Sequence, residues 1–137
     1  MYNFKRFIFP ASFIFSASVA FCATDPAKAK VYDDVIAPVL AAKCYDCHGA
    51  NKDKGKLRLH TKEALLKGGK GAKDKIIVKG KLDDSELYYR IDLPNDDDDV
   101  MPPFDEDEPH NPVTPEEKKV FAAWILDGAS FDAKVSD

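Results

Sequence analysis

The chain of 137 residues has few side chains that bind metals tightly: three cysteines, three histidines and two methionines, one of them the initiator Met1. It also lacks a long apolar run. The longest, from Phe7 to Phe21, is interrupted by Pro10 and is shorter than the roughly 20 residues that cross a bilayer. No internal repeat and no alternation of strands with helices is visible, which argues against a thioredoxin-like domain.

The amino terminus has the pattern of an export signal. Lys5 and Arg6 precede the apolar run, small residues lie near its end, and the sequence becomes polar from Asp25. We therefore expect residues 1–23 to be a secretory signal peptide and residues 24–30 to be a linker. The protein is then expected in the periplasm or outside the cell.

The cleavage point stays open, because the sequence after Ala20, Cys22 or Ala23 is suitable. Residues 19–22 also resemble a bacterial lipoprotein box, although Phe21 is bulky where that signal has a small residue, so a lipid anchor at Cys22 is the alternative. In either case the mature chain of roughly 115 residues suits one domain and has no candidate transmembrane span.

One pentapeptide, C-x-x-C-H, carries the strongest chemical signal. It comprises Cys44, Cys47 and His48 and is the pattern that attaches a haem covalently. Two thiols about one helical turn apart can add to the two vinyl groups along one edge of the porphyrin. The histidine then lies under the iron and can serve as its proximal ligand. We therefore expect one covalent haem c with its iron.

Other interpretations of the two cysteines fit less well. A thioredoxin-like pair expects a surrounding βαβ unit, whereas a helix is predicted before Cys44. A zinc site needs four ligands, and only His48, His60 and His110 could join the cysteines, so zinc is a remote alternative. A disulfide from Cys44 to Cys47 would close too short a loop to stabilise much.

Met101 is the candidate for the second, distal iron ligand. It lies in V-M-P-P, and the two prolines that follow fix φ and exclude a helix, so the thioether is presented from a stiff extended loop. It follows His48 by 53 positions, enough chain to reach the other face of a haem. Without the C-x-x-C-H pattern, a lone core methionine before a proline turn would be the ordinary interpretation.

Two histidines compete with Met101 for the distal position. His60 comes only 12 residues after His48, and His110 lies in an acidic, proline-rich loop. Ligation of the iron by two histidines is thus the alternative to ligation by His48 and Met101.

The remaining pattern predicts an all-α fold. Apolar spacing indicates a first helix from Val31 to Leu40 that runs toward Cys44 and that Pro38 should kink or divide. T-P-E-E at residues 114–117 is a capping box that begins the last helix. The apolar face of that helix comprises Val120, Phe121, Trp124 and Ile125, and Gly128 should stop it. We expect these two helices to pack together around the haem.

Two shorter helices are predicted between them. Thr61 can cap one that ends before Gly68. Asp84 or Ser85 can cap another, whose apolar side chains are those of Leu87, Tyr88 and Ile91.

Charge is distributed unevenly along the chain. Residues 52–81 contain ten lysines and Arg58 against three acidic residues, a net charge of +8. Residues 83–108 contain twelve acidic residues against Arg90, a net charge of −11. Such a separation orients encounters with charged partners, and redox complexes are typically small and transient. The run Asp96–Asp99 lacks the spaced ligands of an EF-hand, and nucleic-acid binding is not expected from an exported, net acidic chain.

The chain resembles a class I c-type cytochrome, and more closely the planctomycete-type cytochrome c domain. The resemblance rests on I-A-P-V-L before the C-Y-D-C-H-G motif, L-R-L with the following G-G-K-G, S-E-L-Y-Y-R-I, M-P-P, and T-P-E-E through W-I-L-D-G-A. It spans about residues 31–131 and leaves residues 132–137 as a tail. It implies a small helical domain around one haem, with thioethers from Cys44 and Cys47, His48 proximal and Met101 distal.

With both axial positions filled, the iron has no open site for oxygen or peroxide, so the expected function is electron transfer and not enzymatic catalysis. The alternative is a haem-binding interaction or sensor module that docks to a secreted partner. Larger proteins that carry this domain fuse it to other secreted modules, so both a free shuttle and a subunit of a larger secreted or membrane-associated complex remain open.

Overall fold

The computed structural model describes residues 30–104 and 111–132, so the expected signal peptide and nearly all of the C-terminal tail lie outside the described residues. Helices and loops make up the described part, in which no β-strand occurs; an isolated bridge pairs His48 with Asp53. The predicted all-α class is therefore confirmed. Within these same ranges, no helix is both long and apolar enough to cross a membrane.

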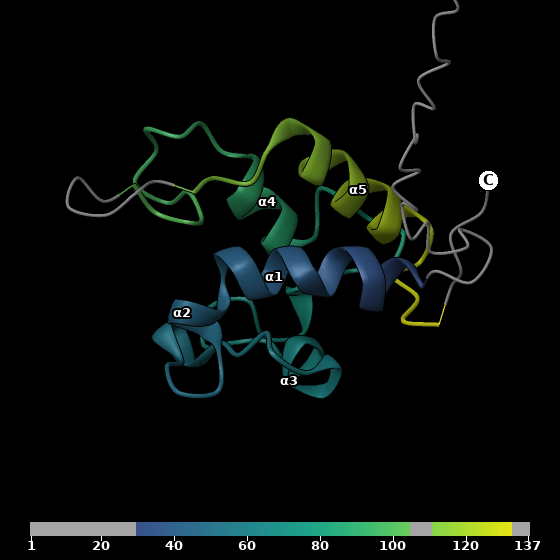
Figure 1. The fold of residues 1–137 in the computed structure, drawn as a ribbon, viewed down its shortest axis with the longest axis horizontal. Helices are drawn as coiled ribbons and strands as arrows, with labels where there is room; N and C mark the ends of the chain where they lie inside the picture. Colours follow the sequence, from purple (N-terminus) through teal and green to yellow (C-terminus); the bar gives the residue numbers. More distant parts are fainter. Residues whose placement is uncertain (1–29, 105–110, 133–137) are drawn as a thin grey trace, which may run out of the picture.

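The first helix lies across the middle of the fold (Figure 1). It consists of a π-helical segment, η2 (Val31–Ile36), and the α-helix α1 (Ala37–Lys43). The expected division near Pro38 is present, because the hydrogen-bonding register changes at Ala37, whose N–H donates to the carbonyl oxygen of Tyr32. Pro38 has no N–H to donate to the preceding turn. The short helix α2 (Tyr45–His48) follows and contains Cys47 and His48.

The basic segment, residues 52–81, lies on one side of α1 and contains three short helices: η3 (Lys54–Lys56), α3 (Lys62–Lys67) and η4 (Lys73–Lys75). The predicted cap of α3 is confirmed, since Thr61 Oγ1 accepts a hydrogen bond from the N–H of Ala64 at 3.1 Å. The helix ends at Gly68, whose φ of 69° is accessible mainly to glycine. This segment lies below α1 in Figure 1.

Helix α4 (Glu86–Asp92) begins after Ser85 as predicted, but Ser85 makes no cap hydrogen bond with its side chain. The hydroxyl is instead fully buried in the preceding loop. It accepts a hydrogen bond from the N–H of Val78 at 2.9 Å and donates to the carbonyl oxygen of Lys81 at 2.7 Å. The Ser85 hydroxyl, which the sequence pattern assigned to the cap of α4, is therefore used by the loop that precedes the helix.

Removing the Ser85 hydroxyl should destabilise the protein. Ser85→Ala loses two part-buried hydrogen bonds, to Val78 and Lys81, each worth about 0.5–1.5 kcal/mol in the free energy of unfolding. Urea denaturation of the haem-loaded protein measures the change, with Asp83→Ala, a substitution at an exposed neighbouring residue, as the control. Equal midpoints for Ser85→Ala and wild type would contradict the assigned role.

Helix α5 (Pro115–Leu126) lies beside α4 on the other side of α1 (Figure 1). Its predicted capping box is confirmed: Thr114 Oγ1 accepts from the N–H of Glu117 at 3.2 Å, and the N–H of Thr114 donates to Glu117 Oε2 at 2.7 Å. Gly128, with φ at 91°, follows the last turn where the sequence predicted the stop.

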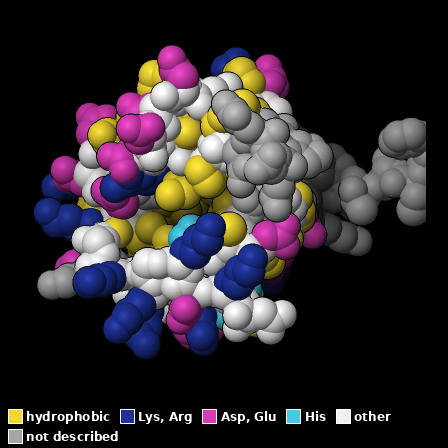
Figure 2. Space-filling view, turned by 90° about the vertical axis from the view of Figure 1, so that its left-hand side faces the viewer, with side chains coloured by type: hydrophobic (Ala, Val, Ile, Leu, Met, Phe, Trp, Pro, Cys, Tyr) yellow, Lys and Arg dark blue, Asp and Glu magenta, His cyan; other side chains and the backbone are white. Residues whose placement is uncertain are grey.

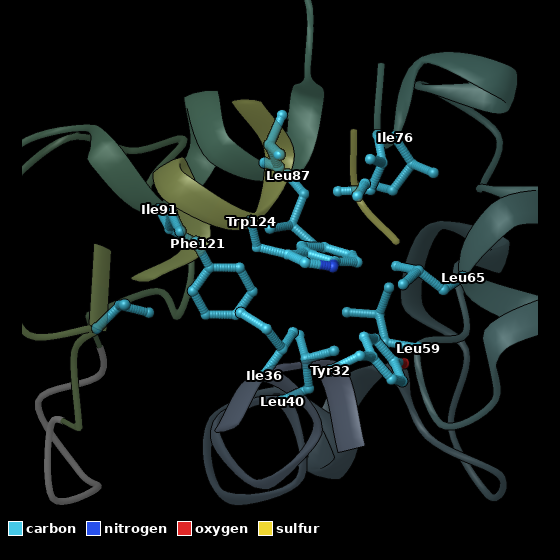
Figure 3. Close-up of a cluster of buried hydrophobic side chains, with 14 residues drawn as sticks. Tyr32, Ile36, Leu40, Leu59, Leu65, Ile76, Leu87, Ile91, Phe121 and Trp124 are labelled. Carbon is cyan, nitrogen blue, oxygen red and sulfur yellow. The ribbon is translucent and has the colours of Figure 1, made fainter. Parts of the chain in front are cut away.

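The first and last helices pack against each other in the core, as predicted (Figure 3). The ring centroids of Tyr32 and Trp124 are 5.5 Å apart, and the indole N–H of Trp124 donates to the carbonyl oxygen of Ser130 at 2.8 Å. Phe121, Ile36 and Leu40 extend the contact along the two helices. Burial of these side chains fixes the position of Cys44, which directly follows α1.

Glu117 should make the stability sensitive to acid. Burial raises the pKa of its carboxyl, but hydrogen bonds from Thr114 and Lys43 outweigh this and lower it below the ordinary 4.5. A depressed pKa gives stability above the unfolded value that is lost as pH falls through the folded value. Between about pH 5 and 3 the unfolding midpoint of wild type should fall faster than that of Glu117→Gln. If the unfolding midpoints of wild type and Glu117→Gln fall with pH in parallel, as those of wild type and the exposed control Glu116→Gln should, this role of Glu117 is contradicted.

Candidate functional site

A mainly apolar cavity opens between α1, α4 and the basic segment. Its empty volume, including the space open to solvent at its mouth, is about 950 Å³. Apolar lining side chains come from most of the helices and the loops between them: Val39, Leu40, Leu57, Leu59, Ile76, Leu87, Ile91, Val113 and Phe121. Figure 2 shows an apolar hollow with a histidine at its edge.

Three of the four predicted haem residues line this cavity. Cys44 and His48 do so from the turn after α1 and from α2, and Met101 does so from the loop after α4, more than 50 residues later. Cys47 is half-buried in α2 and is not among the lining residues. The N–H of His48 donates to the carbonyl oxygen of Cys44 at 2.8 Å, so the motif forms one compact helical turn.

The ring of His48 has a backbone partner behind it. Its Nδ1 lies 3.4 Å from the carbonyl oxygen of Leu57. If Nδ1 carries the proton, it donates to this oxygen and leaves Nε2 with a free lone pair, which is the tautomer that a metal-bound histidine requires. The loop from His48 to Leu59 is held in place by the N–H of Leu59, which donates to the carbonyl oxygen of His48 at 2.8 Å.

Two glycines are required by the close packing around this loop. A Cβ on Gly49 would lie 2.3 Å from the carbonyl oxygen of Tyr45, and one on Gly69 would lie 2.9 Å from Cβ of Leu57. Gly69 also lines the cavity. Because it has no side chain, its backbone can approach Leu57, whose carbonyl oxygen contacts His48. Any larger residue at either position would displace the backbone that orients the histidine.

The Cys44 thiol lies in a strongly apolar environment. Desolvation by burial raises its pKa to about 12, so the sulfur is a protonated thiol at neutral pH. A thioether bond leaves this sulfur uncharged, which suits the surroundings better than a thiolate does. Both cysteines of the motif are free in the structure. The donor set and the apolar walls therefore fit a covalently held haem.

Met101 is tied to α4 through its backbone. Its N–H donates to the carbonyl oxygen of Arg90 at 3.0 Å, and the buried Val100 precedes it. Met101 is 37% exposed and lines the cavity, so it lies where the cavity meets the surface. Met101 lies outside any helix, as the sequence predicted, but at a bend with a cis peptide bond to Pro102 and not in an extended loop.

The competing histidines do not complete a site in the described residues. His60 does not line the cavity; its Nδ1 is buried without a hydrogen-bond partner, and its ring lies edge-on to Tyr45 with centroids 6.5 Å apart. His110 lies outside the described residues. Within residues 30–104 and 111–132, no group of three or more His, Cys, Asp or Glu side chains is placed to hold a metal ion.

Polar residues at the cavity were not foreseen as site residues. Lys54, Glu86 and Arg90 line it, and Arg90 donates through Nε to Glu86 Oε1 at 2.7 Å. The i,i+4 spacing of Glu86 and Arg90 could have indicated their pair, since both fall on one face of a helix. Nothing in the sequence brings Lys54 to the same cavity, because its position depends on how the segment after α2 folds.

The family model described as Planctomycete cytochrome C matches residues 44–105. The matched range begins at the first cysteine of the motif and extends past Met101. The resemblance stated from the sequence is thereby confirmed for this range, while the first and last helices lie outside it. No curated protein and no solved structure matches the chain.

Proposed function

Because residues 44–105 belong to the planctomycete cytochrome c family, we propose that this c-type cytochrome is an exported mono-haem electron carrier. The observation that carries the proposal is the convergence of Cys44, His48 and Met101 on one apolar cavity. Cys44 and His48 come from one end of the matched range and Met101 comes from the other. Covalently bound haem is what the family implies, and one C-x-x-C-H motif accounts for one haem.

The residues divide the work of holding the haem. Cys44 and Cys47 supply the thioethers, His48 the proximal ligand and Met101 the distal ligand. Leu57 orients the histidine through its carbonyl oxygen. Lys54 and Arg90 place positive charge beside the cavity, where it can complement the carboxylates of a haem.

Bound haem supplies an iron that alternates between Fe(III) and Fe(II). His48 and Met101 would hold this iron, so electron transfer would need little rearrangement of the chain. Apolar walls exclude water from the site, and a methionine ligand favours the reduced state and raises the potential. The half-exposed mouth around Met101 leaves a short path to a partner.

Opposite charges flank that mouth and support docking by electrostatic steering. Lys54 lies on one wall and Glu86 on another. Figure 2 shows basic side chains beside and below the hollow and acidic ones above it. A partner with the reverse arrangement would be oriented with its redox centre toward the mouth, and its association rate would fall as salt rises.

Voltammetry of the purified haem-loaded protein tests the proposal. An electron carrier should give a reversible one-electron wave and exchange electrons rapidly with small redox mediators. The reduced protein should not bind carbon monoxide, because both axial positions are filled. An irreversible response together with ready binding of carbon monoxide would contradict the carrier function and favour an interaction or sensor module.

A further inference from the structure

The distal loop, defined as the described residues 93–104 and 111–114 between α4 and α5, is held to the helices by two cations. Arg90 holds its outgoing part. The guanidinium contacts Asp99 Oδ1 at 2.6 Å and is itself fixed by Glu86 at 2.7 Å. The Arg90 carbonyl oxygen also accepts from the N–H of Met101. One residue of α4 thus contacts the loop on both sides of the buried Val100.

Lys43 holds the returning part of the same loop. Its side chain is only 7% exposed. Its Nζ donates to Asn111 Oδ1 at 2.8 Å and to the carbonyl oxygen of Pro112 at 2.7 Å, and lies 3.2 Å from Glu117 Oε2. These three acceptors match the three N–H bonds of an ammonium group. A buried lysine is rare unless it is paired in this way.

The position of Lys43 connects this network of hydrogen bonds to the proposed haem site. It directly precedes Cys44, and Pro112 directly precedes Val113, which is buried and lines the cavity. The ammonium therefore links the haem-attachment turn to the part of the distal loop that returns from Met101. Glu117 couples both to the first turn of α5 through its bond from the N–H of Thr114.

We propose that Lys43 is a positioning residue for the distal ligand. Its buried ammonium fixes the returning part of the distal loop against the haem-attachment turn, while Arg90 fixes the outgoing part, so that Met101 is kept at the cavity. The inference rests on the proposed role of Met101 as an iron ligand. Lys43 acts through the loop and touches neither the iron nor the methionine side chain.

External imidazole measures how firmly the loop is held, because it binds only when Met101 has left the iron. Its apparent affinity scales with the fraction of protein in that open state. In Lys43→Met the loop loses its tie and three polar groups lose their partner. The oxidised protein should then bind imidazole about tenfold more tightly. The visible absorption band that arises from methionine sulfur bound to Fe(III) should weaken in parallel.

Lys62→Met is the matched control, since Lys62 forms an ion pair of 3.0 Å with Asp33 away from the cavity. It should leave the band and the imidazole affinity unchanged. If Lys43→Met does not fold, Asn111→Ala removes a single acceptor at an exposed residue and should shift both readouts in the same direction. A folded Lys43→Met or Asn111→Ala with the wild-type band and the wild-type imidazole affinity would overturn the inference. A wild-type protein without the methionine band would instead overturn the proposed ligation itself.

Discussion

Replacing Met101 by alanine should open one axial position on the iron and lower the reduction potential on the order of 100 mV or more, given that axial ligands set haem potentials over about 0.8 V. The reason is the loss of a sulfur ligand that favours Fe(II). The methionine-to-iron absorption band should vanish, and the reduced protein should bind carbon monoxide. Optical spectra and voltammetry of the purified variant measure these changes.

Two comparisons make this test specific. Met101→His should restore a filled axial position while keeping the potential low, because imidazole favours Fe(II) less than a thioether does. Leu66→Ala, which truncates an exposed apolar side chain on α3 away from the cavity, should behave as wild type. If the wild type lacks the band and Met101→Ala keeps the wild-type spectrum and potential, another residue is the distal ligand, and His110 becomes the first candidate.

Removing the haem should destabilise the fold. In the double variant Cys44→Ala, Cys47→Ala, prepared free of haem, the apolar side chains around the cavity face an open space instead of a ligand. Loss of a ligand that binds only the folded state lowers stability, and a loss of a few kcal/mol lowers the melting temperature by at least about 10 °C in a domain of this size. Thermal unfolding followed by circular dichroism measures the difference from the haem-loaded wild type.

The single variant Cys47→Ala serves as the internal control for that experiment. It keeps Cys44 and His48 at the cavity, so one thioether can still hold the haem, and its melting temperature should lie between the other two. A haem-free double variant that unfolds at the wild-type temperature would show that the apolar core around Trp124 and Phe121 is sufficient by itself. The cavity would then be a binding site without a part in folding.

Local patterns predicted the helices because their signals are local. Thr61 and the T-P-E-E box cap where expected, since an N-cap depends on residues three positions apart. Ser85 shows the limit of this reasoning. Its hydroxyl is used by Val78 and Lys81, and that choice depends on the loop that precedes α4 and not on the helix itself.

Only the residues of the site that belong to recognisable motifs could be predicted from the sequence. C-x-x-C-H and M-P-P identified residues that the fold brings to one cavity, and the histidine count limited the rivals. Lys43 has no such signature. It is one lysine among many, and its burial follows from the approach of residues 111–117, nearly 70 positions later. Contacts of that kind depend on tertiary packing and produce no periodic pattern in the sequence.

The most direct test of the account is a haem stain on a denaturing gel. The precursor is exported in a host that matures c-type cytochromes, and the wild type is compared with Cys44→Ala, Cys47→Ala. The account predicts that haem stays with the wild-type band after denaturation and is absent from the variant, because only thioether bonds survive these conditions. Exported, folded wild-type protein without bound haem would contradict it.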